Sequence, residues 1–158
     1  MKIAYTAISG DVAIAHSASK EQVELSMGPL SDDEFAAHIL ERSVPDGAAN
    51  VMVFPENWSP PDSGIYRAAW QCVDGEVKIG MGRAKQIHRQ MLRDRRAVLF
   101  SGLDVEFIRA QEDDDREALK RIAAQKKKLR DVTSHPLIDK AETINDLETL
   151  TLEKILED

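Results

Sequence analysis

The residue types that most often form metal or catalytic sites are few in this sequence, and their spacing is not that of a site. A zinc site is built from closely spaced histidine or cysteine ligands, and no histidine here has another three to five residues away. A lone cysteine in an apolar segment is typical of a small core residue rather than of a nucleophile. The residues concerned are His16, His38, His88, His135 and Cys72.

Two patterns that bind ions in other proteins are incomplete. Gly80 and Gly82 precede a predicted helix, but no third glycine follows at the spacing of a dinucleotide loop, and no Gly-Lys-Ser/Thr sequence is present. The acidic run 113–115 would attract a hard cation, yet capping and the helix dipole explain three acids before a helix. We therefore expect no enzyme activity, no catalytic residue, no cofactor and no metal ion.

Charge is segregated along the chain. Residues 1–82 hold five Lys/Arg and twelve Asp/Glu, residues 83–130 hold fourteen and eight, and residues 131–158 hold two and eight. This distribution predicts either that the acidic ends fold back on the basic middle or that the basic middle is an interaction surface.

Nucleic-acid binding is the sharpest hypothesis for the basic segment. Arg89, Arg93 and Arg96 recur at helical spacing and residues 126–128 are three lysines, so contacts with phosphates are physically reasonable. The chain as a whole nevertheless carries a net charge of −7, and the acids of residues 131–158 compete for the same cations. We therefore do not expect nucleic acid as a partner.

The composition is that of a folded domain. The chain has 158 residues, of which 42% are hydrophobic and 31% charged, and this length is enough for a real core. A single cysteine excludes a disulfide framework. No apolar run approaches 18 residues and no leader is evident, so we expect an intracellular protein without a membrane span.

The first half of the N-terminal region contains a hairpin pattern and a helix start. Residues 1–8 and 12–16 are rich in strand formers and are separated by a turn signal. Residues 20–27 suit either a strand or a helix. Ser31 with Glu34 is the pattern of a capping box, which predicts that a helix begins there.

The second half of this region predicts three strands. Residues 50–54 indicate a buried strand, and the prolines of residues 55–64 predict an irregular loop. Residues 66–73 and 76–81 resemble two strands, and Asp-Gly at 74–75 suits a tight hairpin turn between them.

From residue 83 the apolar period becomes helical. A stripe at steps of three and four, interrupted by Asp94 and Ser101, comprises Ile87, Met91, Val98, Val105 and Ile108. It is broadened by Leu92, Leu99, Leu103 and Ala110. A second helix after the acidic run has apolar positions at Ala118, Ile122, Leu129 and Val132. Two such helices joined by a short turn predict an antiparallel hairpin, and Thr143 then caps a short helix.

These elements predict an α+β fold with three parts. Residues 1–82 form a small module of a helix and β-hairpins, and residues 83–133 form a long helical hairpin resembling an antiparallel coiled coil. Residues 134–158 form an acidic helical tail.

Four blocks, taken in order, resemble a family of small tail-associated proteins of tailed bacteriophages and prophages. The blocks are Tyr66-Arg67-Ala68-Ala69-Trp70, Arg83-Ala84-Lys85-Gln86-Ile87-His88-Arg89 with Arg93, Leu103-Asp104-Val105-Glu106 with Arg109-Ala110, and Lys128-Leu129-Arg130-Asp131-Val132-Thr133 with Pro136. The last block also resembles the C-terminal half of tail-fibre assembly proteins. The resemblance covers roughly residues 44–150.

The resemblance implies a non-enzymatic tail accessory or structural protein that docks on tail fibres or the distal tail through its helical hairpin. The alternative is a tail-fibre or tail assembly chaperone that is absent from the mature virion. Either implies tail, tail-fibre or baseplate proteins as partners, a homo-oligomer or multi-copy assembly, and a location in the virion tail or, during assembly, the host cytoplasm. Apolar hairpin positions and a tryptophan in the proline-rich loop are the predicted partner-binding residues: Trp58, Ile87, Met91, Val98, Leu99, Leu103, Ile122 and Leu129.

Overall fold

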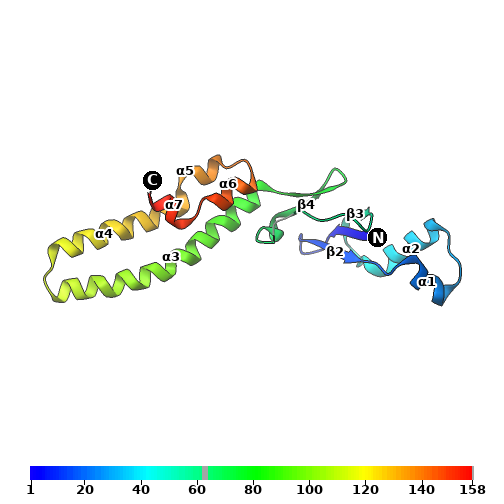
Figure 1. The fold of residues 1–158 in the computed structure, drawn as a ribbon, viewed down its shortest axis with the longest axis horizontal. Coiled ribbons are helices and arrows are strands. Elements are labelled where there is room, and N and C mark those ends of the chain that lie inside the picture. Colours follow the sequence, from blue (N-terminus) through cyan, green and yellow to red (C-terminus); the bar gives the residue numbers. More distant parts are fainter. Residues whose placement is uncertain (62–63, 158) are drawn as a thin grey trace. The chain divides into compact units, whose positions relative to one another are not determined.

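The computed structural model describes residues 1–61 and 64–157, and Figure 1 shows its elements. A small antiparallel sheet with two helices is followed by a 32-residue helix, a second long helix and short C-terminal helices. The predicted α+β fold class is therefore confirmed. The chain divides into two compact units, Met1–Gly80 (the N-terminal unit) and Met81–Asp158 (the helical unit). Of the loop predicted over residues 55–64, positions 62 and 63 lie outside the described residues, as does position 158 of the tail.

The sheet of the N-terminal unit has three antiparallel strands. β1 (Lys2–Thr6) is central, with β2 (Val12–His16) on one side and β3 (Ala49–Phe54) on the other. β1 and β2 form the predicted hairpin. Gly10 in their connection has φ of +89°, a left-handed conformation that glycine adopts without steric cost.

The strand predicted over residues 50–54 is present as β3, but the prediction that it is buried is wrong. β3 is an edge strand, and Val51 and Val53 on one of its faces are 42% and 47% exposed. Met52 and Phe54 on its other face pack against the core. A short apolar run has the same sequence pattern in a central and in an edge strand, so the pattern did not distinguish the two positions.

The two faces of β1 contribute to two small cores. Ile3 packs with residues of α1 (Lys20–Met27) and α2 (Asp32–Ser43). Ala4 points to the opposite face, because side chains alternate along a strand. There it packs with the hairpin of β4 (Trp70–Val73) and β5 (Glu76–Ile79).

Capping side chains decide where both helices of this unit begin. The predicted capping box is confirmed: the Ser31 hydroxyl accepts from the Glu34 backbone N–H, and the Glu34 carboxylate accepts from the Ser31 N–H. The same arrangement joins Ser19 and Gln22, so residues 20–27, which suited either state, form a helix.

The strand predicted over residues 66–73 is correct only in its second half. A 3-10 turn, Arg67–Ala69, precedes β4, which begins at Trp70. A 3-10 turn brings residues three apart to the same side, and Tyr66 and Ala69 are each only 1% exposed. The Asp-Gly turn at 74–75 is confirmed, with φ of 53° and 77° at its two residues.

The helical unit is built on the predicted antiparallel hairpin. α3 (Met81–Glu112) begins two residues before the predicted start, and α4 (Arg116–Asp131) follows the acidic turn. Within that turn Asp114 has a left-handed φ of 50°, and the Asp115 carboxylate accepts from the Ala118 N–H at 3.0 Å. One of the three acids therefore acts as the predicted N-cap.

The C-terminal segment differs in detail from the single short helix that was predicted. After a 3-10 turn, Val132–Ser134, it forms α5 (Pro136–Lys140), α6 (Ile144–Thr149) and α7 (Leu152–Glu157). Pro136 begins α5, since proline suits the first turn of a helix. Elements of this segment pack against α3 and α4, so their apolar residues complete the core of the helical unit. These buried residues are Val132, Ile138, Ala141, Leu147, Leu150, Leu152 and Ile155.

Candidate functional site

α3 carries apolar side chains on two different faces. The buried residues of α3 are Ala84, His88, Leu92 and Ala110. The stripe that the spacing indicated as its main apolar face is not the one that is buried. Val98, Val105 and Ile108 of that stripe are 75%, 49% and 55% exposed. The residues that were expected only to broaden the stripe include Leu92 and Ala110, which are buried.

Three apolar residues of the predicted stripe are each followed, five positions later in the sequence, by an apolar residue on the other face of α3. Five residues turn an α-helix through about 500°, which places the two side chains about 140° apart around the axis. The first residue of each such pair belongs to the predicted stripe, and the second to the side of α3 that is more buried. The pairs are Ile87 and Leu92, Val98 and Leu103, and Val105 and Ala110.

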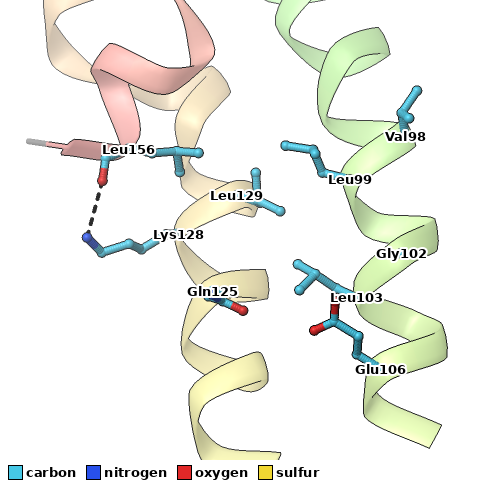
Figure 2. A pocket seen from close by; sticks show the side chains of 9 residues that line it. All are labelled: Val98, Leu99, Gly102, Leu103, Glu106, Gln125, Lys128, Leu129 and Leu156. Carbon is cyan, nitrogen blue, oxygen red and sulfur yellow. Dashed lines mark hydrogen bonds between the residues drawn. The ribbon is translucent and has the colours of Figure 1, made fainter. Parts of the chain in front are cut away.

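A groove of about 490 Å³ lies between α3, α4 and α7. Figure 2 shows that Leu99 and Leu103 of α3 point toward Leu129 of α4, and that Leu156 of α7 lies near Leu129. We call this surface the hairpin groove. Its lining residues are Val98, Leu99, Gly102, Leu103, Glu106, Gln125, Lys128, Leu129 and Leu156.

Gly102 lines the groove without a side chain. A Cβ atom at Gly102 would meet no other atom within 4 Å. Glycine inside a helix costs about 1 kcal/mol relative to alanine, so this residue lowers the stability of the helix while leaving space beside it. Leu99, one turn away, remains 45% exposed.

Polar groups surround the apolar part of the groove. Glu106, Gln125 and Lys128 contribute to its lining, and the Lys128 Nζ donates to the Leu156 carbonyl at 3.3 Å (Figure 2). This hydrogen bond joins α4 to α7 beside the groove. An apolar centre with a polar rim is the usual anatomy of a protein–protein interface.

The eight predicted partner-binding residues belong to both units and to different surfaces of the helical unit. Trp58 lies in the N-terminal unit and is half-buried, with its ring stacked on Phe54 at a centroid distance of 4.0 Å. Ile122 is 1% exposed, so its side chain is used to hold the hairpin together. Ile87 and Met91 line a different hollow on α3. Only the remaining four come together in the hairpin groove: Val98, Leu99, Leu103 and Leu129.

Sequence reasoning missed part of this site. Gly102 and Leu156 had not been proposed, nor had Glu106 or Lys128 as a groove residue. The only available signal was a glycine inside a strongly helical segment, which often marks a close approach or an open surface. The position of Leu156 follows from the folding back of the C-terminal segment, which no local pattern encodes.

Basic side chains of α3 bind backbone carbonyls of the helical unit. Arg96 donates to the Arg130 carbonyl at 2.9 Å, near the end of α4. Arg89 donates to the Thr133 carbonyl at 3.2 Å and pairs with Asp139 at 2.5 Å. Carbonyls at helix ends lack helical partners and attract cations. These two arginines, which had been considered for phosphate binding, are thus used inside the helical unit.

His88 is a buried polar side chain of the helical unit. It is 5% exposed, and its Nε2 lies 3.0 Å from the Leu150 carbonyl, which accepts a hydrogen bond from the protonated nitrogen. Burial lowers the pKa of His88 below its usual value of 6.5, and the charges of Arg95 and Arg89 lower it further. The hydrogen bond to Leu150 acts in the opposite direction.

The lowered pKa of His88 predicts that the helical unit loses stability in mild acid. Below pH 6.5 the histidine of the unfolded chain binds a proton more readily than that of the folded chain. The free energy of unfolding therefore decreases as the pH is lowered, by at most about 1.4 kcal/mol per pH unit. His88→Gln keeps a donor for the Leu150 carbonyl but does not titrate. Urea unfolding followed by circular dichroism at 222 nm, between pH 7.5 and 5.5, should show a smaller loss of stability in this variant. His38→Gln in the N-terminal unit is the control, and an equal slope in all three proteins would contradict the prediction.

Among residues 1–61 and 64–157, no group of three or more His, Cys, Asp or Glu side chains is placed to hold a metal ion. Burial raises the pKa of the Cys72 thiol, which makes it a weaker nucleophile at neutral pH. In the same described part of the chain, no helix is both long and apolar enough to cross a membrane.

Comparison with protein-family models, with curated proteins and with solved structures found no match to this chain.

Proposed function

We propose that this protein is a non-enzymatic accessory protein of a bacteriophage tail that holds an apolar segment of a tail protein in its hairpin groove. The groove is the observation that carries the docking role, because the exposed Leu99 and the half-buried Leu103 line it beside a polar rim. The ordered sequence blocks that resemble small tail-associated proteins support the assignment to a tail. The groove volume of about 490 Å³ is within the range of sites that bury most of a ligand's surface.

The alternative function is that of an assembly chaperone, which holds a tail or fibre subunit and then leaves it. The polar groups Glu106, Gln125 and Lys128 among the groove residues favour this alternative, because a surface that must be exposed again needs polar atoms to remain in water. The two functions use the same groove and differ in whether the complex persists in the particle.

Crosslinking from the groove tests the docking role and separates the two functions. A photoreactive benzoylphenylalanine in place of Gln125 should crosslink to a tail, fibre or baseplate protein, whereas the same group in place of Asp113 in the turn should not. Peptide mass spectrometry of purified particles then measures copy number. A fixed ratio to known tail proteins supports the structural role, and crosslinks found only in the lysate support the chaperone. Failure to crosslink any tail protein in either sample would overturn the proposal.

Two variants of nearly equal exposure control for unfolding. Leu99 in the groove is 45% exposed and Val105 outside it is 49% exposed, both on α3. Leu99→Asp should lower the crosslinking yield from position 125 at least tenfold, since a charge replaces an apolar contact surface. Val105→Asp should leave the yield unchanged, and equal losses in both variants would contradict a role of the groove.

A further inference from the structure

A second apolar surface of α3 repeats every seven residues. Its positions alternate in steps of four and three, which is the spacing of the core positions of a coiled coil. We call it the heptad stripe, and it extends over about 32 Å at 1.5 Å per residue. Its members are Ile87, Met91, Asp94, Val98, Ser101, Val105 and Ile108.

The heptad stripe has little cover within the helical unit. Val98, Val105 and Ile108 are 75%, 49% and 55% exposed. Toward the start of α3 the stripe continues as a hollow of about 440 Å³, and every residue that lines it belongs to α3. These residues are Arg83, Gln86, Ile87, Gln90, Met91, Arg93 and Asp94. Except for Val98, no member of the stripe lines the hairpin groove, so this surface goes beyond the proposed docking site.

The seven-residue repeat indicates that the partner is a helix. Apolar side chains at an average spacing of 3.5 residues form a continuous seam along which a second helix can pack, because the two helices then wind around each other. A globular or extended partner would require no such repeat. The exposed valines, at equivalent positions one heptad apart, are β-branched residues of the kind favoured in a two-helix seam.

The charged residues along the stripe indicate which charges the partner helix carries. On one flank lie the exposed Arg95 and Arg109, which follow core positions directly and so occupy the places where coiled coils form interhelical ion pairs. The charge of Arg95 also attracts Glu153 of α7, whereas Arg109 has no acidic partner among the described residues. On the other flank Asp104 is already paired with Lys126, at 2.7 Å. Asp94, which accepts from the Gln90 amide at 2.8 Å, stands among the core positions and needs a cation or an amide opposite it.

A second copy of this chain fits this pattern poorly. In a parallel pair Asp94 would face Asp94, which places two like charges together. In an antiparallel pair the two kinds of core position face each other, so Asp94 would face Met91 or a valine of the other copy and remain unpaired. In a parallel pair Arg109 would face Asp104 of the other copy, which Lys126 already neutralises, and in an antiparallel pair the flanking arginines would face arginines. The stripe therefore matches a different helix.

We propose that the heptad stripe binds an acidic amphipathic helix of another protein. That helix has apolar residues opposite Met91, Val98 and Val105. It carries a basic or amide residue opposite Asp94, and acidic residues face Arg95 and Arg109.

A synthetic peptide of four heptads tests this proposal with the full-length protein. The probe has leucine at its core positions, lysine at the one opposite Asp94 and glutamate on its flanks, with a fluorescent label for anisotropy. We expect saturable binding that weakens as salt is raised, because the flanking ion pairs are exposed. A second peptide with lysine in place of the flanking glutamates should bind at least tenfold more weakly.

Three variants locate the binding on the stripe. Val105→Asp should weaken binding of the first peptide at least tenfold, whereas Leu99→Asp, which alters the hairpin groove, should leave it unchanged. Asp94→Lys should weaken binding of the first peptide and restore it for a peptide that carries glutamate at the facing position. Circular dichroism at 222 nm should be the same for all three variants, since the replaced side chains are exposed.

Three outcomes would overturn the helix proposal. Absence of binding, or equal binding by Val105→Asp and the unchanged protein, would show that the stripe does not accept this helix. A dimer in sedimentation that Val105→Asp dissociates would show that a second copy covers the stripe. Failure of the groove crosslinks with intact peptide binding would remove the docking proposal alone, and the reverse result would remove the helix proposal alone.

Discussion

Replacing Ile122 by aspartate is expected to unfold the helical unit while the N-terminal unit keeps its fold. Ile122 is the most deeply buried side chain of α4, with 1% exposure, and it lies where α4 packs against α3. An unpaired carboxylate there costs about 4 kcal/mol, which is comparable with the whole stability of a small domain. The burial of Ile122 thus indicates a folding role within the hairpin, and its contact with a partner stays a prediction.

Two spectroscopic signals follow the units separately. Both tryptophans, Trp58 and Trp70, lie in the N-terminal unit, so their fluorescence reports on that unit alone. The long helices α3 and α4 lie in the helical unit and dominate the signal at 222 nm. Ile122→Asp should lose most of that signal with unchanged fluorescence, whereas Val105→Asp on the exposed stripe should keep both. Retention of the full helical signal by Ile122→Asp would refute the predicted packing.

Replacing Ile3 by aspartate is expected to have the converse effect. Ile3 is fully buried in the central strand β1, where it packs in a core with Val23 and Ile39. The unit has only about 80 residues and two small cores, so an unpaired charge in one of them removes about 4 kcal/mol from a modest stability. The tryptophan emission should shift to the red and lose its cooperative transition in urea, while most of the signal at 222 nm persists.

The edge strand offers a matched control for this result. Val53 is the registered neighbour of Ile3 on β3 and points to the same face of the sheet, but it is 47% exposed. Val53→Asp should change the free energy of unfolding by less than about 1 kcal/mol, because its carboxylate remains in water. An equally large loss in both variants would mean that the edge of the sheet is covered in solution.

Local rules determined most of the elements. The capping box at Ser31 and Glu34, the turn at 74–75 and the acidic cap before α4 each depend on atoms within a few residues, and the sequence predicted all three. The prediction of a strand over residues 66–73 was wrong in its first half. A 3-10 turn forms there instead, because it buries apolar residues that are three positions apart, which a strand does not.

The candidate site was only partly visible in the sequence. Apolar periodicity found Val98, Leu99, Leu103 and Leu129, all of which line the hairpin groove. The same periodicity could not tell which face of α3 packs, since apolar residues occur on both sides of the helix about 140° apart. It also could not place Leu156 in the groove.

The sequence by itself determined the α+β class and the helical hairpin, because these depend on local spacing and composition. Only the tertiary structure decided that the face of Leu92 and Ala110 is buried and the heptad stripe is not. The decision comes from α4 and the C-terminal segment, which pack on α3, and this segment gives His88 a carbonyl partner at Leu150. Burial depends on which segments far apart in the chain meet, and a pattern within one helix holds no information about the segment that will cover it.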